Sequence, residues 1–134
     1  MTPQLDFIGI VVSDIAASVA FYRRLGLEFP PDAEQAGHVE ATLPNGVRLA
    51  LDTEAEVKSF LPEWTPPVGT SRLGVGFRCD DPTEVDAVYN DLVNAGYHGE
   101  KKPWDAPWGQ RYATVHDPDG TGVDLYAVLS TSPA

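Results

Sequence analysis

The sequence contains one structural unit twice, and this repeat constrains the possible fold more than any other feature. An apolar, β-branched segment at residues 7–12 precedes a helical pattern and then a second strand-like segment at 45–51. The same order returns in the second half, where residues 74–79 precede a helical pattern and then residues 119–125. Two copies of a small unit commonly enclose a cleft, so residues facing such a cleft are the first candidates for function.

Each half contains one clear amphipathic helix. In the first half, Ser13 or Asp14 is suited to cap the helix and Gly26 follows its end. In the second half, Asp81 precedes a proline at the first helical position, and Gly96 ends the pattern. The apolar residues at helical spacing are Ile15, Val19, Tyr22 and Leu25 in the first helix, and Val85, Val88, Tyr89 and Leu92 in the second.

Strand-like segments follow each helix, and tight turns at 44–46 and 117–120 join the last two of each set. The segments cover residues 27–29, 38–43 and 47–51 in the first half, and 99–102, 110–115 and 123–128 in the second. We therefore expect an α+β chain of two tandem βαβββ modules that form a curved sheet around a cleft. The expected divisions are a first module at 1–60, a Pro/Gly-rich linker at 61–70, a second module at 71–129 and a tail at 130–134.

The composition indicates a folded protein and excludes several classes of partner. Of the 134 residues, 43% are hydrophobic and 22% are charged, and no apolar run is long enough to span a bilayer. The net charge of −11 repels nucleic acid and anionic membranes, so we expect neither as a partner. The N-terminal residues show no signal-peptide pattern, and the single cysteine, Cys79, lies in an apolar strand. These features predict a cytoplasmic location and a buried, unreactive thiol.

Paired units in this order resemble the vicinal oxygen chelate superfamily, which includes glyoxalase I, extradiol dioxygenases and bleomycin-resistance proteins. The resemblance is carried by Phe-Tyr-Arg-Arg-Leu-Gly-Leu at residues 21–27 and by Asp-Pro-Asp-Gly at 117–120, and it extends from about residue 5 to 128. It implies the fold, whereas activity varies widely on this scaffold.

The resemblance also implies where a catalytic metal would be held. The metal enzymes of the superfamily place His, Glu or Gln at four strand positions, which in this chain are Phe7, Ala50, Gly74 and Asp124. Only Asp124 has a side-chain donor atom, and one carboxylate falls short of the three or more protein ligands of a catalytic site. We therefore expect neither a catalytic metal nor another cofactor.

Polar residues on the strands provide an alternative site. His38 and Glu40 share one strand parity and are expected to lie near Asp52 or Asp124. A site around His38, Glu40 and Asp124 would support a glyoxalase-like lyase, isomerase or dioxygenase acting by acid–base chemistry. His116 lies beside the second turn, which we expect it to orient.

Aromatic residues stand in place of metal ligands. Trp104 and Trp108 lie in a Pro/Gly-containing segment that resembles the tryptophan-bearing segment beside the drug groove of bleomycin-resistance-type proteins. That resemblance implies a homodimer that sequesters a bulky aromatic or cationic natural product and so confers antibiotic resistance. A domain that binds a peptide or a biosynthetic intermediate is a further possibility. The candidate ligand-binding residues are Phe7, His38, Asp52, Trp64, Trp104, Trp108, Tyr112, Asp124 and Tyr126.

Overall fold

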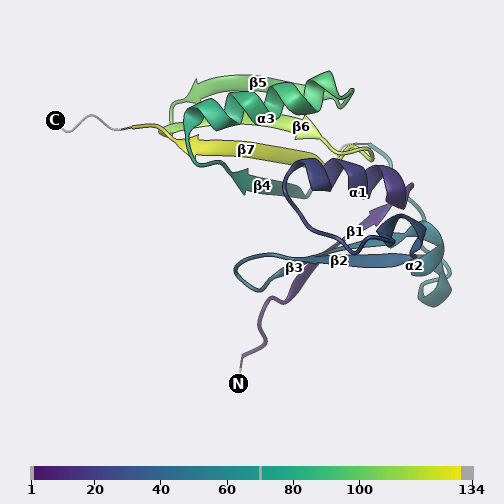
Figure 1. Ribbon diagram of the computed structural model, residues 1–134. Coiled ribbons are helices and arrows are strands. Elements are labelled where there is room, and N and C mark those ends of the chain that lie inside the picture. The colour runs from purple at the N-terminus through teal and green to yellow at the C-terminus, as the bar shows by residue number, and fades with distance from the viewer. Residues whose placement is uncertain (1, 70, 131–134) are drawn as a thin grey trace. The chain divides into compact units, whose positions relative to one another are not determined.

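The computed structural model describes residues 2–69 and 71–130, which form a mixed α+β fold, as the sequence predicts (Figure 1). The chain divides into two compact units, unit 1 at residues 1–68 and unit 2 at 69–134. Each unit has its own sheet, with three strands in unit 1 and four in unit 2, so the strands form two sheets. Most of the tail expected at 130–134 and one residue of the expected linker, Thr70, lie outside the described residues.

Unit 1 consists of a three-stranded sheet with two α-helices and a short 3₁₀ helix. Its elements are β1 (Phe7–Val12), α1 (Ile15–Arg24), η1 (Ala33–Gln35), β2 (His38–Thr42), β3 (Arg48–Thr53) and α2 (Glu54–Phe60). In the order β1-β3-β2, β1 runs parallel to β3 and β2 runs antiparallel to it. Ile10, Leu51 and Val39 are register partners and all three are buried, so they form the core face of this sheet.

The first helix forms as its sequence predicts. The Asp14 side chain accepts a hydrogen bond from the backbone N–H of Ala17 at 3.2 Å, which satisfies one of the free donors of the first turn. The buried face includes Val19, Phe21 and Tyr22. Gly26 then adopts a φ of 91°, a left-handed conformation that favours glycine at the end of a helix.

The strand predicted at residues 27–29 is wrong, because the structure has no strand there. The backbone N–H of Leu27 donates to the carbonyl of Tyr22 at 3.2 Å and so completes the helix terminus. Pro30 and Pro31 follow, and proline has no N–H to donate to a strand ladder. Unit 1 is therefore βαββ followed by α2, instead of βαβββ.

Unit 2 has the predicted order of elements. They are β4 (Gly74–Arg78), α3 (Pro82–Asn94), β5 (Gly99–Ala106), β6 (Gln110–His116) and β7 (Gly122–Val128), with sheet order β4-β7-β6-β5. The Asp81 side chain accepts from the backbone N–H of Glu84 at 2.8 Å, and Pro82 occupies the first turn of α3. Strand β5 extends beyond its predicted end at residue 102, so Trp104 lies in a strand.

The two faces of the unit 2 sheet differ in character. Helix α3 packs on β5, β6 and β7, and buried Val85 and Leu92 lie on the same side of this unit as Val115 and Leu125. Side chains alternate across a strand, so a second set of residues occupies the opposite face. This face holds two pairs of register partners, Tyr112 with Tyr126 and Thr114 with Asp124, together with Gly76, the partner of Asp124 on β4. We call this second surface the aromatic face of unit 2.

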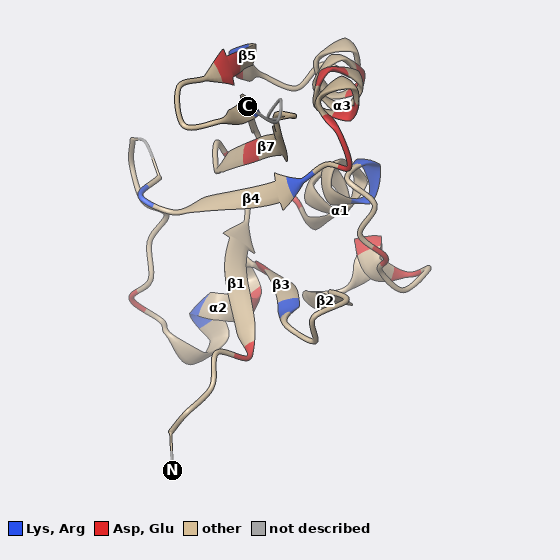
Figure 2. Cartoon of the chain, turned by 90° about the vertical axis from the view of Figure 1, so that its left-hand side faces the viewer, with Lys and Arg blue, Asp and Glu red and all other residues tan. Residues whose placement is uncertain are grey.

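Acidic residues occur on helices, strands and loops of both units, and basic residues are fewer (Figure 2). Cys79 is buried, as predicted, and burial raises the pKa of its thiol to about 11. Among the described residues, no helix has the length and hydropathy needed to cross a bilayer.

Candidate functional site

Asp124 lies at the centre of the aromatic face, in the middle of β7. Its register partners are Gly76 on β4 and Thr114 on β6. The Tyr112 hydroxyl donates to Asp124 Oδ2 at 2.7 Å, and the Thr114 hydroxyl donates to Asp124 Oδ1 at 2.9 Å. Because both carboxyl oxygens accept, the arrangement fits an ionised carboxylate.

Tyr112 is held in its protonated form. Burial, and then the hydrogen bond to Asp124, raise the pKa of the Tyr112 hydroxyl to about 12. The hydroxyl therefore remains a donor to Asp124 at neutral pH. It orients the carboxylate and does not serve as a base.

Aromatic rings lie beside this carboxylate in a continuous group. Tyr112 and Tyr126 are stacked with ring centroids 6.3 Å apart, and Trp108 meets Tyr112 edge-on at 5.5 Å. Trp104 meets Trp108 edge-on at 5.5 Å, and the Lys101 ammonium lies 4.8 Å from the centre of the Trp104 ring. Trp108 is 58% exposed, which is unusual for so large an apolar side chain in a folded protein. The four residues Trp104, Trp108, Tyr112 and Tyr126 form what we call the aromatic cluster.

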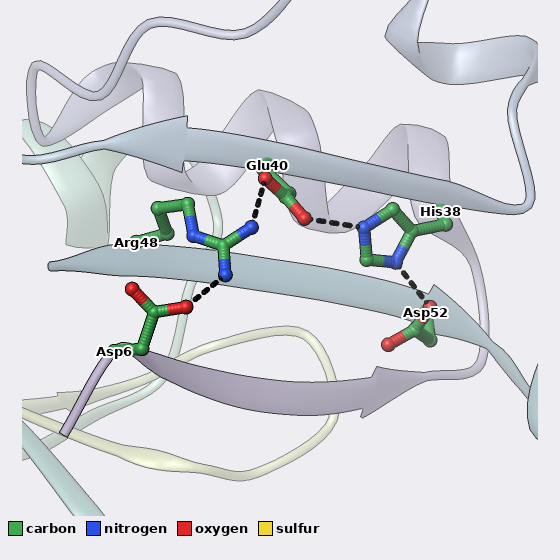
Figure 3. Close-up of polar contacts among 5 residues, drawn as sticks. All are labelled: Asp6, His38, Glu40, Arg48 and Asp52. Atoms are coloured by element: carbon green, nitrogen blue, oxygen red, sulfur yellow. Dashed lines mark hydrogen bonds and ion pairs between the residues drawn. The ribbon is translucent and has the colours of Figure 1, made fainter. Parts of the chain in front are cut away.

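A separate polar network lies on the sheet of unit 1, on the face away from α1 (Figure 3). His38 is the register partner of Asp52, and its Nδ1 lies 2.6 Å from Asp52 Oδ1. Its Nε2 lies 2.8 Å from Glu40 Oε2. Arg48 donates to Glu40 Oε1 at 2.8 Å and pairs with Asp6 through its other terminal nitrogen. We call these five residues the His38 network.

The geometry of this network favours a charged imidazole. Both ring nitrogens of His38 face carboxylate oxygens, and only the imidazolium donates from both. Hydrogen bonds to Glu40 and then to Asp52 raise the pKa of His38, against a smaller opposing effect of burial. In return, hydrogen bonds from His38 and then Arg48 lower the pKa of Glu40.

The remaining two candidates of unit 1 are Phe7, which contacts the Arg48 end of the His38 network, and Trp64. Phe7 is 53% exposed, and the guanidinium carbon of Arg48 lies 5.4 Å from the centre of its ring. Trp64 is half-buried beside a shallow hollow of about 540 Å³, which it lines with Leu61, Pro62 and Glu63.

The structure thus places the sequence-predicted residues in two groups. The aromatic cluster and Asp124 come together within unit 2. His38, Glu40 and Asp52 come together within unit 1, which is one of the two neighbourhoods expected for His38. The partners of Asp124 within its own unit are Tyr112 and Thr114.

Three participating residues were absent from the predicted set: Thr114, Arg48 and Asp6. Thr114 shares the strand parity of Tyr112, which is a signal that sequence offers, but its contact with Asp124 depends on the register of β6 against β7. Arg48 shares the parity of Asp52 on β3. Asp6 precedes β1, and nothing local in the sequence indicates its ion pair.

The prediction that His116 orients the 117–120 turn is wrong. The Asp117 side chain performs this role, since its Oδ1 accepts from the backbone N–H groups of Asp119 and Thr121, each at 2.9 Å. His116 instead pairs with Glu100 across the strands β6 and β5.

The four positions at which the resemblance implies metal ligands lack the donor atoms of a catalytic metal site. Phe7, Ala50 and Gly74 have no side-chain donor atom, and both oxygens of Asp124 accept from hydroxyl groups. Within residues 2–69 and 71–130, no group of three or more His, Cys, Asp or Glu side chains is arranged to hold a metal ion.

Known structures share this fold along nearly the whole chain. The chain is similar to a glyoxalase/bleomycin resistance protein/dioxygenase from Nocardioides, with 25% identity, a TM-score of 0.76, and coverage of 98% of this chain and 87% of that one. A glyoxalase/bleomycin resistance protein/dioxygenase family enzyme from Burkholderia phytofirmans PsJN has 20% identity and a TM-score of 0.80 over 95% of this chain and 100% of its own. A glyoxalase-related enzyme from Fulvimarina pelagi also has 20% identity and a TM-score of 0.80, over 94% and 88% of the two chains.

No curated protein matches the sequence. The model of one protein family does match it, from residue 4 to residue 125, which is most of the chain. With the fold of the two units, this match shows that the chain belongs to the Glyoxalase/Bleomycin resistance protein/Dioxygenase superfamily.

Proposed function

We propose that this protein binds a bulky aromatic or cationic natural product without a metal, and that it confers antibiotic resistance by sequestration. The observation that carries the proposal is the aromatic cluster, in which exposed Trp108 joins three further rings beside the carboxylate of Asp124. Aromatic surface next to a few placed polar groups is typical of small-molecule sites. The active form that we propose is a homodimer in the cytoplasm.

The energetics of sequestration are sufficient without chemistry. A planar ligand that covers roughly 200–300 Å² of apolar surface gains about 5–7 kcal/mol from burial, before the costs of association. A small number of polar contacts then brings the total near the roughly −8 kcal/mol that corresponds to micromolar affinity. Asp124 is positioned to supply such a contact.

Changing Trp108 to alanine tests the site directly. Trp108→Ala should weaken the binding of planar aromatic antibiotics by about ten-fold or more, since it removes an exposed stacking surface. Calorimetric titration measures the effect without relying on tryptophan fluorescence. Phe60→Ala removes an aromatic side chain that is 63% exposed in unit 1, and it should leave the affinity unchanged. Equal affinity of the Trp108→Ala variant and the parent protein would remove the assignment.

Metal independence has its own test. Elemental analysis is performed before and after dialysis against Zn²⁺, Fe²⁺, Mn²⁺ and Ni²⁺, and we expect no stoichiometric metal because three of the four superfamily positions lack donors. A stoichiometric metal that is lost on changing His38 or Glu40 would contradict the proposal and indicate an enzyme.

The His38 network favours a second candidate function, a glyoxalase-like enzyme acting by acid–base chemistry. An imidazolium between two carboxylates is a proton donor at neutral pH. Turnover of a candidate substrate that disappears in both His38→Gln and Asp124→Asn variants would support this function over sequestration. Turnover that survives both changes would exclude it.

A further inference from the structure

We infer that the ligand of the aromatic face carries a positive charge next to its aromatic ring, and that Asp124 is the counter-ion of this charge. The inference rests on the proposed function and names the chemical class of the ligand: an aromatic amine or quaternary ammonium compound. The aromatic cluster, the contacts of Asp124 and the open space opposite this carboxylate support it.

The first observation is that Asp124 has neutral neighbours. Its two hydrogen-bond donors, the hydroxyls of Tyr112 and Thr114, are uncharged. Within the part of the chain that the structure describes, no ion pair joins Asp124 to a basic group, whereas Asp6, Asp52, Asp86 and Asp105 each have one. A carboxylate on a half-buried aromatic surface without a counter-ion attracts a cation from solution.

The second observation is the orientation of the neighbouring rings. Tyr112 and Tyr126 are stacked beside the carboxylate, and the faces of aromatic rings carry partial negative charge. The cluster already binds one cation in this manner, since Lys101 lies over Trp104. Carboxylate and ring faces therefore favour the same sign of charge in a ligand.

The third observation concerns Gly76, the register partner of Asp124 on β4. A Cβ atom built at Gly76 meets no other atom within 4 Å, and Gly76 is not among the glycines with positive φ. Neither packing nor backbone conformation requires glycine there, although glycine weakens a strand. The space opposite the carboxylate is therefore available to a ligand that approaches the backbone closely.

Arg78 limits where the charge of the ligand lies. It is the last residue of β4 and the register partner of Tyr126. A ligand cation near Arg78 would be repelled, so the cation belongs beside Asp124 and away from the end of β4 that Arg78 occupies. The same residue makes an aromatic anion the main competing ligand class.

Three probes with the same ring system test the inference: 2-naphthylmethylamine, 2-naphthylmethanol and 2-naphthoate. We expect calorimetric titration to show that the ammonium compound binds about ten-fold more tightly than the neutral alcohol. Asp124→Asn should bring this ratio to about one while the alcohol binds as before. Asp91→Asn, which removes the same charge from an exposed position of α3, should keep the preference.

A second variant separates the open space from the charge. Gly76→Val introduces a residue that favours strands into space that other atoms do not occupy. We expect an equal or higher melting temperature together with weaker binding of the ammonium probe. Loss of stability together with binding would contradict the assigned role of Gly76.

The remaining outcomes distinguish failure of the inference from failure of the proposed function. Equal binding of the amine and the alcohol, both weakened by Trp108→Ala, would overturn the cationic class and leave the aromatic site intact. Tighter binding of 2-naphthoate than of the ammonium probe would overturn the cationic class in favour of an anionic ligand held by Arg78. Binding of none of the probes at millimolar concentration would overturn the inference and the proposed function together.

Discussion

At the scale of single residues, the charge state of His38 indicates most clearly how one side chain contributes to the stability of the fold. Its imidazole joins β2 to β3 through Asp52, and Glu40 relays the network to Arg48 and Asp6 (Figure 3). The network links groups on or beside all three strands of the unit 1 sheet, so it has a structural role whether or not it also has a chemical one. A structural role makes a definite prediction for the pH dependence of stability.

The pKa of His38 is raised in the folded protein, so folding favours its protonated form. The resulting stabilisation is fully present below the unfolded pKa of about 6.5 and is lost as the pH rises through the higher folded pKa. We expect the free energy of unfolding of the parent protein to exceed that of His38→Gln by about 1 kcal/mol or less near pH 6, since the side chain is 43% exposed and solvent screens the pairs. The difference should decrease toward pH 9.

Urea denaturation between pH 5 and 9 measures this difference. Glu40→Gln, which alters the hydrogen bond that contributes most to the raised pKa of His38, should reduce this pH dependence. An NMR titration in which the His38 ring loses its proton at or below the ordinary pKa would contradict the interpretation of the network.

At the scale of secondary-structure elements, the caps explain which helices sequence could predict. Helices α1 and α3 combine an aspartate cap with an apolar stripe, and both are confirmed. Helix α2 was not predicted because Val57 is its only buried residue, so it lacks a stripe. The only local sign of a helix start is a capping-box pattern, in which Thr53 is followed three residues later by Glu56.

This reasoning predicts that α2 depends on its cap. The Thr53 hydroxyl accepts from the backbone N–H of Glu56 at 3.1 Å. Thr53→Val keeps the shape of the side chain and removes the acceptor, so it should lower the free energy of unfolding by roughly 0.5–2 kcal/mol. Thr53→Ser keeps the acceptor and should lose much less. Equal denaturant midpoints for the valine and serine variants would show that the cap does not stabilise α2.

Strand parity and strand register differ in how far sequence determines them. Parity placed Asp124 and Tyr126 on one face of β7, as the alternating burial of this strand shows. The partners of Asp124 depend on register, which the loop closed by the Asp117 side chain helps to fix. Sequence therefore singled out Asp124 and all four residues of the aromatic cluster, whereas the Thr114 contact required the structure. The predicted strand at 27–29 was wrong because the backbone N–H of Leu27 serves the end of α1.

At the scale of the whole molecule, charge is the dominant property. The chain has 20 acidic and 9 basic residues, so repulsion among carboxylates acts throughout it even where arginines are paired. Exposed ion pairs each contribute only about 0–1 kcal/mol, and salt screens them along with the repulsion. With a net charge of −11, screening of the repulsion should have the larger effect.

We therefore expect the melting temperature at pH 7.5 to rise as NaCl is increased from about 20 to about 500 mM, over which the screening length falls several-fold. Glu63→Lys provides the matched control, because it replaces an exposed acidic residue of unit 1 with a basic one. This variant should be more stable than the parent at low salt, and its advantage should shrink at high salt. A melting temperature that falls with salt would mean that the described ion pairs, such as Arg111 with Asp86 and Asp105, outweigh the net repulsion. The excess of acidic residues would then affect solubility and the attraction of ligands, and it would have little influence on the stability of the fold.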